Sequence, residues 1–141
     1  EAVRLFYADA LEAALSRLDE AIIVIRKNTI RSVYVALIYS WRATVLRMLL
    51  ARKSADGALD RKLLNLTKQA VRAARFMAWS YPIERPHALR EAGEVALLQG
   101  RQEKAVRFYK ASLLEAERLE MPREAAKTSE RMEELVNAVQ M

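Results

Sequence analysis

The sequence has 141 residues, of which 52% are hydrophobic and 30% charged, and it contains no cysteine. The missing cysteines exclude disulfides and thiolate metal sites, and they favour a reducing, cytoplasmic location. The net charge of +6 is concentrated in residues 22–79, which hold twelve basic side chains and only two acidic ones, Asp56 and Asp60. A field this asymmetric can steer an acidic partner towards the middle of the chain.

Good helix formers dominate the composition, and the chain has only three glycines and three prolines. We therefore expect an all-α fold. The longest uncharged run, residues 32–41, is about half as long as a membrane-spanning helix, and no secretory signal pattern precedes it. We expect no membrane association. The chain begins at Glu1 inside an amphipathic segment, which we interpret as a cut from a longer protein.

The 3.6-residue periodicity predicts six helices, the first over residues 2–26 and the second over residues 28–52. Asn28 is the candidate N-cap of the second helix. This helix is apolar nearly all round, so we expect it to be the central, most buried one. The first helix carries an apolar stripe formed by Leu11, Ala14, Leu18, Ala21, Ile22 and Ile25.

Turn signals separate the remaining helices. The loop ending at Gly57 precedes Asp60, which can cap a third helix over residues 61–80. Pro86 suits the first turn of a fourth helix, which Gly100 ends. A fifth helix follows over residues 102–120, and Pro122 opens a sixth. The expected core face of the third helix is Leu63, Leu66, Ala70, Ala74 and Met77, and the narrow stripe of the sixth is Ala125, Ser129, Met132, Val136 and Val139.

A short sequence motif occurs in both the third and the fifth predicted helix. Residues 69–74 read Gln-Ala-Val-Arg-Ala-Ala, and residues 104–109 read Lys-Ala-Val-Arg-Phe-Tyr. Each copy lies in the second helix of a helix–turn–helix pair. The alanine of each copy, Ala70 or Ala105, is small enough to let two helices approach closely. The copies lie thirty-five residues apart, and a repeat of this length is typical of helical repeat proteins.

The strongest pattern lies in residues 86–120, where a glycine ends one helix and an alanine followed by an aromatic begins the next. The positions concerned are Leu89, Ala92, Gly93, Ala96, Gly100, Ala105, Tyr109 and Ser112. This spacing resembles a tetratricopeptide repeat. Leu89 stands where that family often has Trp, Ala96 where it often has Tyr, and the closing proline arrives late, as Pro122. The longer pair at residues 28–80 resembles the lengthened repeats of bacterial signalling ATPases, cyclases and maltose-regulator-like activators.

The resemblance implies a right-handed superhelical stack of antiparallel helix pairs. It places one domain over residues 1–141, with approximate units 1–27, 28–80 and 85–120 and a capping helix at residues 122–140. The family lines a concave groove with the first helix of each pair. On that basis the groove-facing candidates are Tyr39 and Arg42 in the second helix and His87, Arg90 and Glu94 in the fourth.

Patterns of catalytic or metal-binding residues are missing from the sequence. His87 is the only histidine, and we interpret it as a surface or capping residue whose pKa a helix N-terminus would lower slightly. The sequence has no nucleophilic triad, Gly-rich phosphate loop or zinc spacing. We therefore expect a non-enzymatic domain with no catalytic residues, no metal and no cofactor.

Four basic side chains of the third predicted helix fall within roughly 60° of one another at 100° per residue. They are Arg61, Lys68, Arg72 and Arg75, and we call them the basic stripe. The stripe could be a solvated face, a face that docks on an acidic domain of the same chain, or a site for an acidic protein or peptide. Nucleic acid is disfavoured, because no reader motif accompanies the charge and the aromatic residues lie mainly on other helices.

The leading hypothesis is a protein-interaction or scaffold domain of a regulatory or signalling protein, since stacked helix pairs present an extended binding surface. A small-ligand-sensing domain, with a pocket near Tyr39 or Trp41, is the alternative. Nucleic-acid binding through the basic stripe is a third. Because Phe6, Leu11 and Leu18 would leave an unpaired apolar face on the first helix, a homo-oligomer is also possible.

Overall fold

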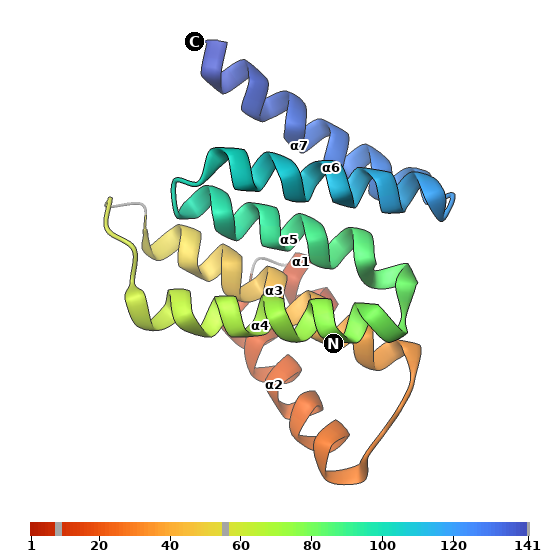
Figure 1. The fold of residues 1–141 in the computed structure, drawn as a ribbon. Helices are drawn as coiled ribbons and strands as arrows, with labels where there is room; N and C mark the ends of the chain where they lie inside the picture. The colour runs from red at the N-terminus through yellow and green to blue at the C-terminus, as the bar shows by residue number, and fades with distance from the viewer. Residues whose placement is uncertain (8–9, 55–56, 141) are drawn as a thin grey trace. The chain divides into compact units, whose positions relative to one another are not determined.

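The computed structural model describes residues 1–7, 10–54 and 57–140, apart from the side chains of residues 3, 5 and 7. All regular secondary structure in these residues is helical (Figure 1). The elements are α1 (Ala2–Tyr7), α2 (Leu11–Asn28), α3 (Val33–Lys53), α4 (Arg61–Ser80), the short 3₁₀ helix η1 (Pro82–Glu84), α5 (Arg85–Leu98), α6 (Gln102–Arg118) and α7 (Pro122–Gln140). The all-α prediction is confirmed, and α2 to α7 correspond to the six predicted helices.

The chain divides into two compact units, Glu1–Glu84 and Arg85–Met141. The first contains α1 to α4 with η1, and the second contains α5 to α7. The boundary falls in the connection that the sequence predicted between residues 80 and 85. The predicted units 1–27 and 28–80 therefore lie together in the first unit.

One hydrophobic cluster of the first unit lies between α2 and α3. Leu11 and Leu18 of α2 pack with Val45 and Leu49 of α3, and all four are buried. Each buried Leu or Val stabilises the fold by roughly 1.5–3 kcal/mol relative to an exposed one. Partly buried side chains from four helices complete the cluster: Ala2, Phe6, Leu15, Ile38, Trp41, Met48 and Leu63.

The predicted first helix over residues 2–26 is wrong at its N-terminal end, because α1 stops at Tyr7 and α2 begins at Leu11. Ala10 has φ −97° and ψ 67°, which is outside the helical region. The break lets α1 pack against α2. It also lets the Phe6 ring meet the Trp41 ring of α3 edge to face, with centroids 4.8 Å apart. The break therefore accompanies a contact between Phe6 and Trp41, which is thirty-five residues away in the chain. Local periodicity contains no information about such a contact.

The apolar face expected to promote self-association is part of the core. Leu11 is fully buried and Leu18 is 4% exposed. The exposed apolar residues of α2 are instead Ile23 and Val24, near its C-terminal end. The prediction that Leu11 and Leu18 form an uncovered apolar face is therefore wrong.

Asn28 is the last residue of α2, so its predicted role as the N-cap of the next helix is wrong. Its Nδ2 donates to the Val24 carbonyl at 2.9 Å, and Thr29 then leaves the helix with φ 50°. The N-cap of α3 is Ser32, whose Oγ accepts a hydrogen bond from the Tyr34 N–H at 3.2 Å. Both residue types favour helix ends, and the connection between the helices is longer than expected.

Helix α3 is the most extensively buried helix of the first unit, as predicted. Tyr34 is an exception, since it is 71% exposed. By length and composition α3 could also cross a membrane. Half of its apolar stretch is buried inside the protein, and the core helices of soluble proteins share this composition, so this is weak evidence for a span.

Helix α4 has the predicted bounds, and Asp60 caps it by accepting the Leu63 N–H at 2.9 Å. Gly57 has the positive φ that its loop predicted, whereas residues 55 and 56 of that loop lie outside the described residues. Leu66 is 38% exposed and does not belong to the core face. The buried residues of α4 are Thr67, Ala70, Val71, Ala74 and Ala78.

In the second unit, α5 and α6 run side by side in opposite directions (Figure 1). Gly93 of α5 faces the fully buried Tyr109 ring of α6, and a Cβ at Gly93 would lie 2.9 Å from Tyr109 Cε1. Ala105, one turn earlier on α6, is also fully buried. Gly100, with φ 74°, occupies the left-handed conformation after α5. A small residue on each helix therefore permits the close approach that Tyr109 fills.

Helix α7 covers this pair, although not with its whole predicted stripe. Met132 and Leu135 pack on the cluster around Tyr109, and Thr128 is fully buried. Val136 and Val139 are 55% and 66% exposed. The predicted apolar face is therefore covered only in part, and the covered face is centred nearer Thr128.

We predict that Gly93→Ala destabilises the second unit by about 1–3 kcal/mol, because the added methyl overlaps the Tyr109 ring. At an ordinary helix position the same change would stabilise by about 1 kcal/mol. Urea denaturation followed by circular dichroism measures the difference. The cost should shrink when Gly93→Ala is combined with Tyr109→Leu, and a stabilised single variant would contradict the close contact.

Candidate functional site

The three groove candidates of α5 point into the second unit's own structure. Arg90 Nη1 lies 2.8 Å from Glu124 Oε2 of α7. Glu94 accepts two bonds from Arg131 of α7, at 2.6 Å from Nε and 3.1 Å from Nη2. The Arg90 and Glu94 side chains are only 11% and 10% exposed. Both therefore bind α7 and are not available as an open partner surface.

Two buried hydroxyl groups lie beside these ion pairs. Ser112 Oγ of α6 donates to the Pro86 carbonyl of α5 at 2.7 Å and lies 3.0 Å from Thr128 Oγ1 of α7. Arg90 also donates to Thr128 Oγ1 at 3.4 Å. Buried polar atoms of this kind are stable only when hydrogen-bonded. We call Arg90, Glu94, Ser112, Glu124, Thr128 and Arg131 the polar seam, and it joins all three helices of the second unit.

His87 lies beside the polar seam and is largely buried, with 14% of its side chain exposed. Its Nε2 is 3.9 Å from Glu91 Oε1, and the Glu91 side chain is 2% exposed. Burial lowers the pKa of His87 to about 4, even though the Glu91 carboxylate opposes the shift. The prediction of a surface residue is wrong. The predicted direction of the pKa shift is right, but its main cause is desolvation and not the helix dipole.

The candidates on α3 also belong to the first unit's packing. Arg42 Nε donates to Asp19 Oδ1 of α2 at 2.7 Å, and the Arg42 side chain is 19% exposed. Tyr39 is half-buried. Arg42 therefore bridges two helices, a role that sequence periodicity does not distinguish from ligand binding.

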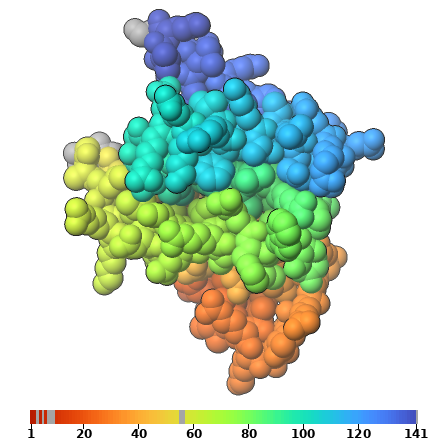
Figure 2. Space-filling view, in the orientation of Figure 1, coloured from red at the N-terminus to blue at the C-terminus, as the bar shows by residue number. Residues whose placement is uncertain are grey.

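The basic stripe lies on the surface of α4, as predicted. Arg61, Arg72 and Arg75 are exposed and Lys68 is half-buried. The buried residues of α4 lie on another side of the helix. Figure 2 shows the yellow-green segment of α4 on the face turned towards the viewer.

Two exposed aromatic residues extend the basic stripe towards the C-terminal end of α4. Phe76 is 78% exposed and Trp79 is 79% exposed. Trp79 follows Arg61 by eighteen residues, about five helical turns, so the two share one angular position. Phe76 lies roughly 60° away. The expectation that aromatic residues lie mainly on other helices missed this pair, although the same 100° rule would have placed Trp79 in the stripe.

We call Arg61, Lys68, Arg72, Arg75, Phe76 and Trp79 the α4 face. Ile83 of η1, three residues beyond the end of the helix, is 52% exposed. An exposed tryptophan beside arginines is the composition found at the energetic centres of protein interfaces. This face is the candidate functional site.

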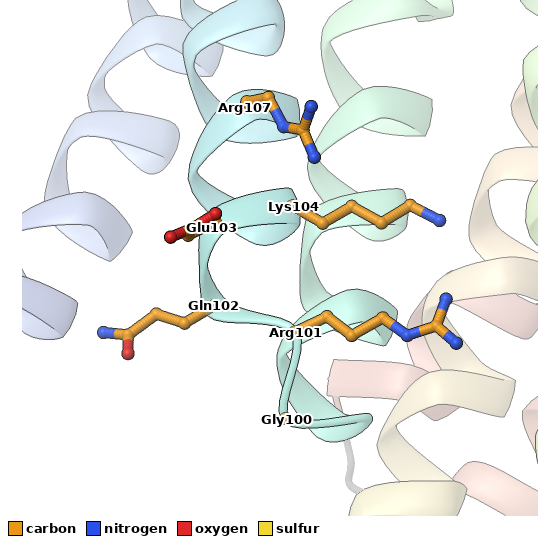
Figure 3. Close-up of a pocket in the computed structure, with 6 residues that line it drawn as sticks. All are labelled: Gly100, Arg101, Gln102, Glu103, Lys104 and Arg107. Carbon is orange, nitrogen blue, oxygen red and sulfur yellow. The ribbon is translucent and has the colours of Figure 1, made fainter.

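A shallow depression lies at the start of α6 and is lined by Gly100, Arg101, Gln102, Glu103, Lys104 and Arg107 (Figure 3). The three basic side chains extend to one side, and Gln102 and Glu103 extend to the other. A second depression lies at the turn between α6 and α7. Both are open to solvent, so neither encloses a small molecule. Within the described residues no three His, Asp or Glu side chains gather in a way that could hold a metal ion.

We predict that Arg131→Gln destabilises the second unit by about 3 kcal/mol, because it leaves the nearly buried Glu94 carboxylate without its guanidinium partner. Urea denaturation provides the measurement. Adding Glu94→Gln should recover most of the loss, since the uncompensated charge is then removed. Arg123→Gln, an exposed change on the same helix, is the matched control and should have little effect. Equal effects of the two single changes would contradict the role assigned to Arg131.

The pKa of His87 predicts that the second unit is less stable at mildly acidic pH. Because the folded-state pKa, about 4, lies below the ordinary value of 6.5, the unfolded chain binds the proton more readily. The stabilising contribution is complete above pH 6.5 and is lost as the pH falls towards 4. We expect a loss of about 2 kcal/mol between pH 7 and pH 5.

Denaturation curves at these two pH values measure this loss. His87→Gln should flatten the dependence, because the titrating group is gone, whatever its effect on stability at pH 7. An unchanged dependence in this variant would show that other groups cause it.

Comparison with known proteins adds no family assignment. Family models, curated proteins and solved structures yield no match to this chain. The described helices establish an all-α fold, and the resemblance to tetratricopeptide repeats stays a prediction from the sequence.

Proposed function

We propose that this chain is a non-catalytic protein-interaction domain, which acts as a scaffold in a cytoplasmic regulatory or signalling protein. The α4 face is the observation that carries the proposal. It presents two aromatic side chains, each more than three-quarters exposed, next to exposed arginines on a single rigid helix. Binding through such a face loses little conformational entropy, because the helix is already formed.

The exposure of Phe76 and Trp79 is the physical basis for a partner. A large aromatic side chain in water forgoes the roughly 25 cal/mol per Å² that burial would provide. Contact with another protein recovers this free energy. Neither residue belongs to the hydrophobic cluster around Leu11 and Val45 or to the buried side of α4.

The polar residues of α5 support the same choice of surface. Arg90 and Glu94 form ion pairs with α7, so the groove expected from the resemblance lacks its charged contacts. The described depressions are shallow, which favours an open protein surface over an enclosed small-molecule site.

We further propose that α3–α4 and α5–α6 are tetratricopeptide-like pairs within a right-handed stack. The support lies in α5–α6, where Gly93 admits the Tyr109 ring and Gly100 adopts a positive φ after the helix. These are the positions at which the sequence resembles the family.

We predict that proteins captured by the chain from a lysate of its source organism depend on the aromatic residues of the α4 face. The Phe76→Ala/Trp79→Ala variant should lose at least one protein that the wild-type chain enriches, because the apolar anchors are removed. Quantitative mass spectrometry measures the enrichment. Leu114→Ala, which truncates a side chain that is 66% exposed on α6, is the control. The proposal fails if the double variant and the control retain the same proteins.

A further inference from the structure

The positive charge of α4 indicates that its partner is acidic. Its twenty residues include five basic side chains and no acidic one. The nearest acidic residue before it, Asp60, caps the helix and lies 4.0 Å from Lys53. Asp19 of α2 is paired with Arg42. The side chains of α4 itself therefore contribute only positive charge to the α4 face.

The positions along the helix divide the α4 face into two parts. Lys68, Arg72 and Arg75 follow one another over about 10 Å at 1.5 Å per residue. Phe76 and Trp79 occupy the next turn, and Ile83 is exposed just beyond it. A binding segment that fits this order carries carboxylates over about two turns and apolar side chains at one end.

A protein segment and a nucleic acid are the two kinds of partner to compare for the α4 face. Phosphates could pair with the arginines, and bases could stack on Trp79 and Phe76. Apolar side chains of a peptide would bury both aromatic rings, which are more than three-quarters exposed. The sequence has no nucleic-acid reader motif beside its basic residues, so the charge and the two aromatic side chains favour a peptide.

We infer that the α4 face binds an acidic peptide segment, with Arg72 and Arg75 contacting its carboxylates and with Phe76 and Trp79 packing against its apolar side chains. This inference rests on the proposed function and adds the chemistry of the partner. Charge-assisted bonds from arginine to carboxylate give orientation, and the aromatic contacts give most of the affinity.

Selection from a displayed library of random sixteen-residue peptides, with the 141-residue chain as target, tests the inference. We expect enriched peptides rich in Asp and Glu that also carry Leu, Phe or Trp. Neutral or basic enriched peptides that lose binding with Phe76→Ala/Trp79→Ala would overturn the acidic inference and leave the proposed function standing. If no peptide is enriched, both the inference and this use of the face are rejected.

The most enriched peptide, labelled with a fluorophore, provides the quantitative step by fluorescence anisotropy. Arg72→Glu/Arg75→Glu should weaken binding at least tenfold, and Phe76→Ala/Trp79→Ala should do the same. Arg101→Glu/Arg107→Glu makes an identical charge change at the N-terminal end of α6 and should change binding less than twofold. Equal losses in the two charge-reversal variants would show attraction to net charge alone and would overturn the inference. Circular dichroism confirms that each variant is folded.

A twenty-nucleotide oligo-dT strand and vesicles containing anionic lipid test the two other kinds of partner, a nucleic acid and a membrane surface. We expect each to bind more weakly than the peptide and to be unaffected by Trp79→Ala. Tighter binding of either probe, with loss in Trp79→Ala, would replace the peptide by a nucleic acid or a membrane surface. Glu→Gln replacement throughout the peptide should reduce its affinity at least tenfold, because the arginines then lose their charged partners.

Discussion

Two ion pairs hold α7 against α5, and they decide which surfaces of the second unit remain available. Glu94 receives both hydrogen bonds of an Arg131 fork, and Arg90 pairs with Glu124 in a site where both side chains are nearly buried. Burying charged groups costs free energy that their mutual attraction only partly offsets, so such pairs specify an arrangement more than they stabilise it. These pairs place the polar side of α5 in contact with α7. Arg90 and Glu94, which were expected to line a binding groove, therefore contribute to the packing of the second unit.

The first unit distributes its side chains differently. The buried residues of its α2–α3 cluster are aliphatic, and the Arg42–Asp19 pair between α2 and α3 is only partly buried. Helix α4 buries mostly small residues on the side that packs and leaves its long cationic and aromatic side chains outside. Small residues let α4 lie close to α3, and none of the large aromatic residues of α4 is needed to fill the core. Phe76 and Trp79 therefore lie on the surface of the unit, next to arginines that can orient a partner.

Local signals predicted much of the fold. Asp60 caps α4, Gly100 follows α5 with positive φ, and Pro122 opens α7. These features act within a few residues, because capping and backbone restriction are properties of the neighbouring peptide groups. The break before Leu11 was not predicted, since it accompanies a ring contact between Phe6 and a residue of another helix. The candidate site was predicted in part. The basic stripe follows from periodicity alone, but the exposure of its aromatic extension does not.

What the sequence by itself determined is the set of helices, their approximate ends and the segregation of charge, because each depends on residue type and spacing. Only the tertiary structure decided which side of each helix is covered. Periodicity places Arg90 and Glu94 on one face of α5, yet it cannot show that Glu124 and Arg131 lie opposite them. The same holds for Trp79, whose angular position beside the basic stripe follows from periodicity but whose 79% exposure does not. Burial depends on contacts between residues far apart in the chain, and a single sequence carries no direct record of those contacts.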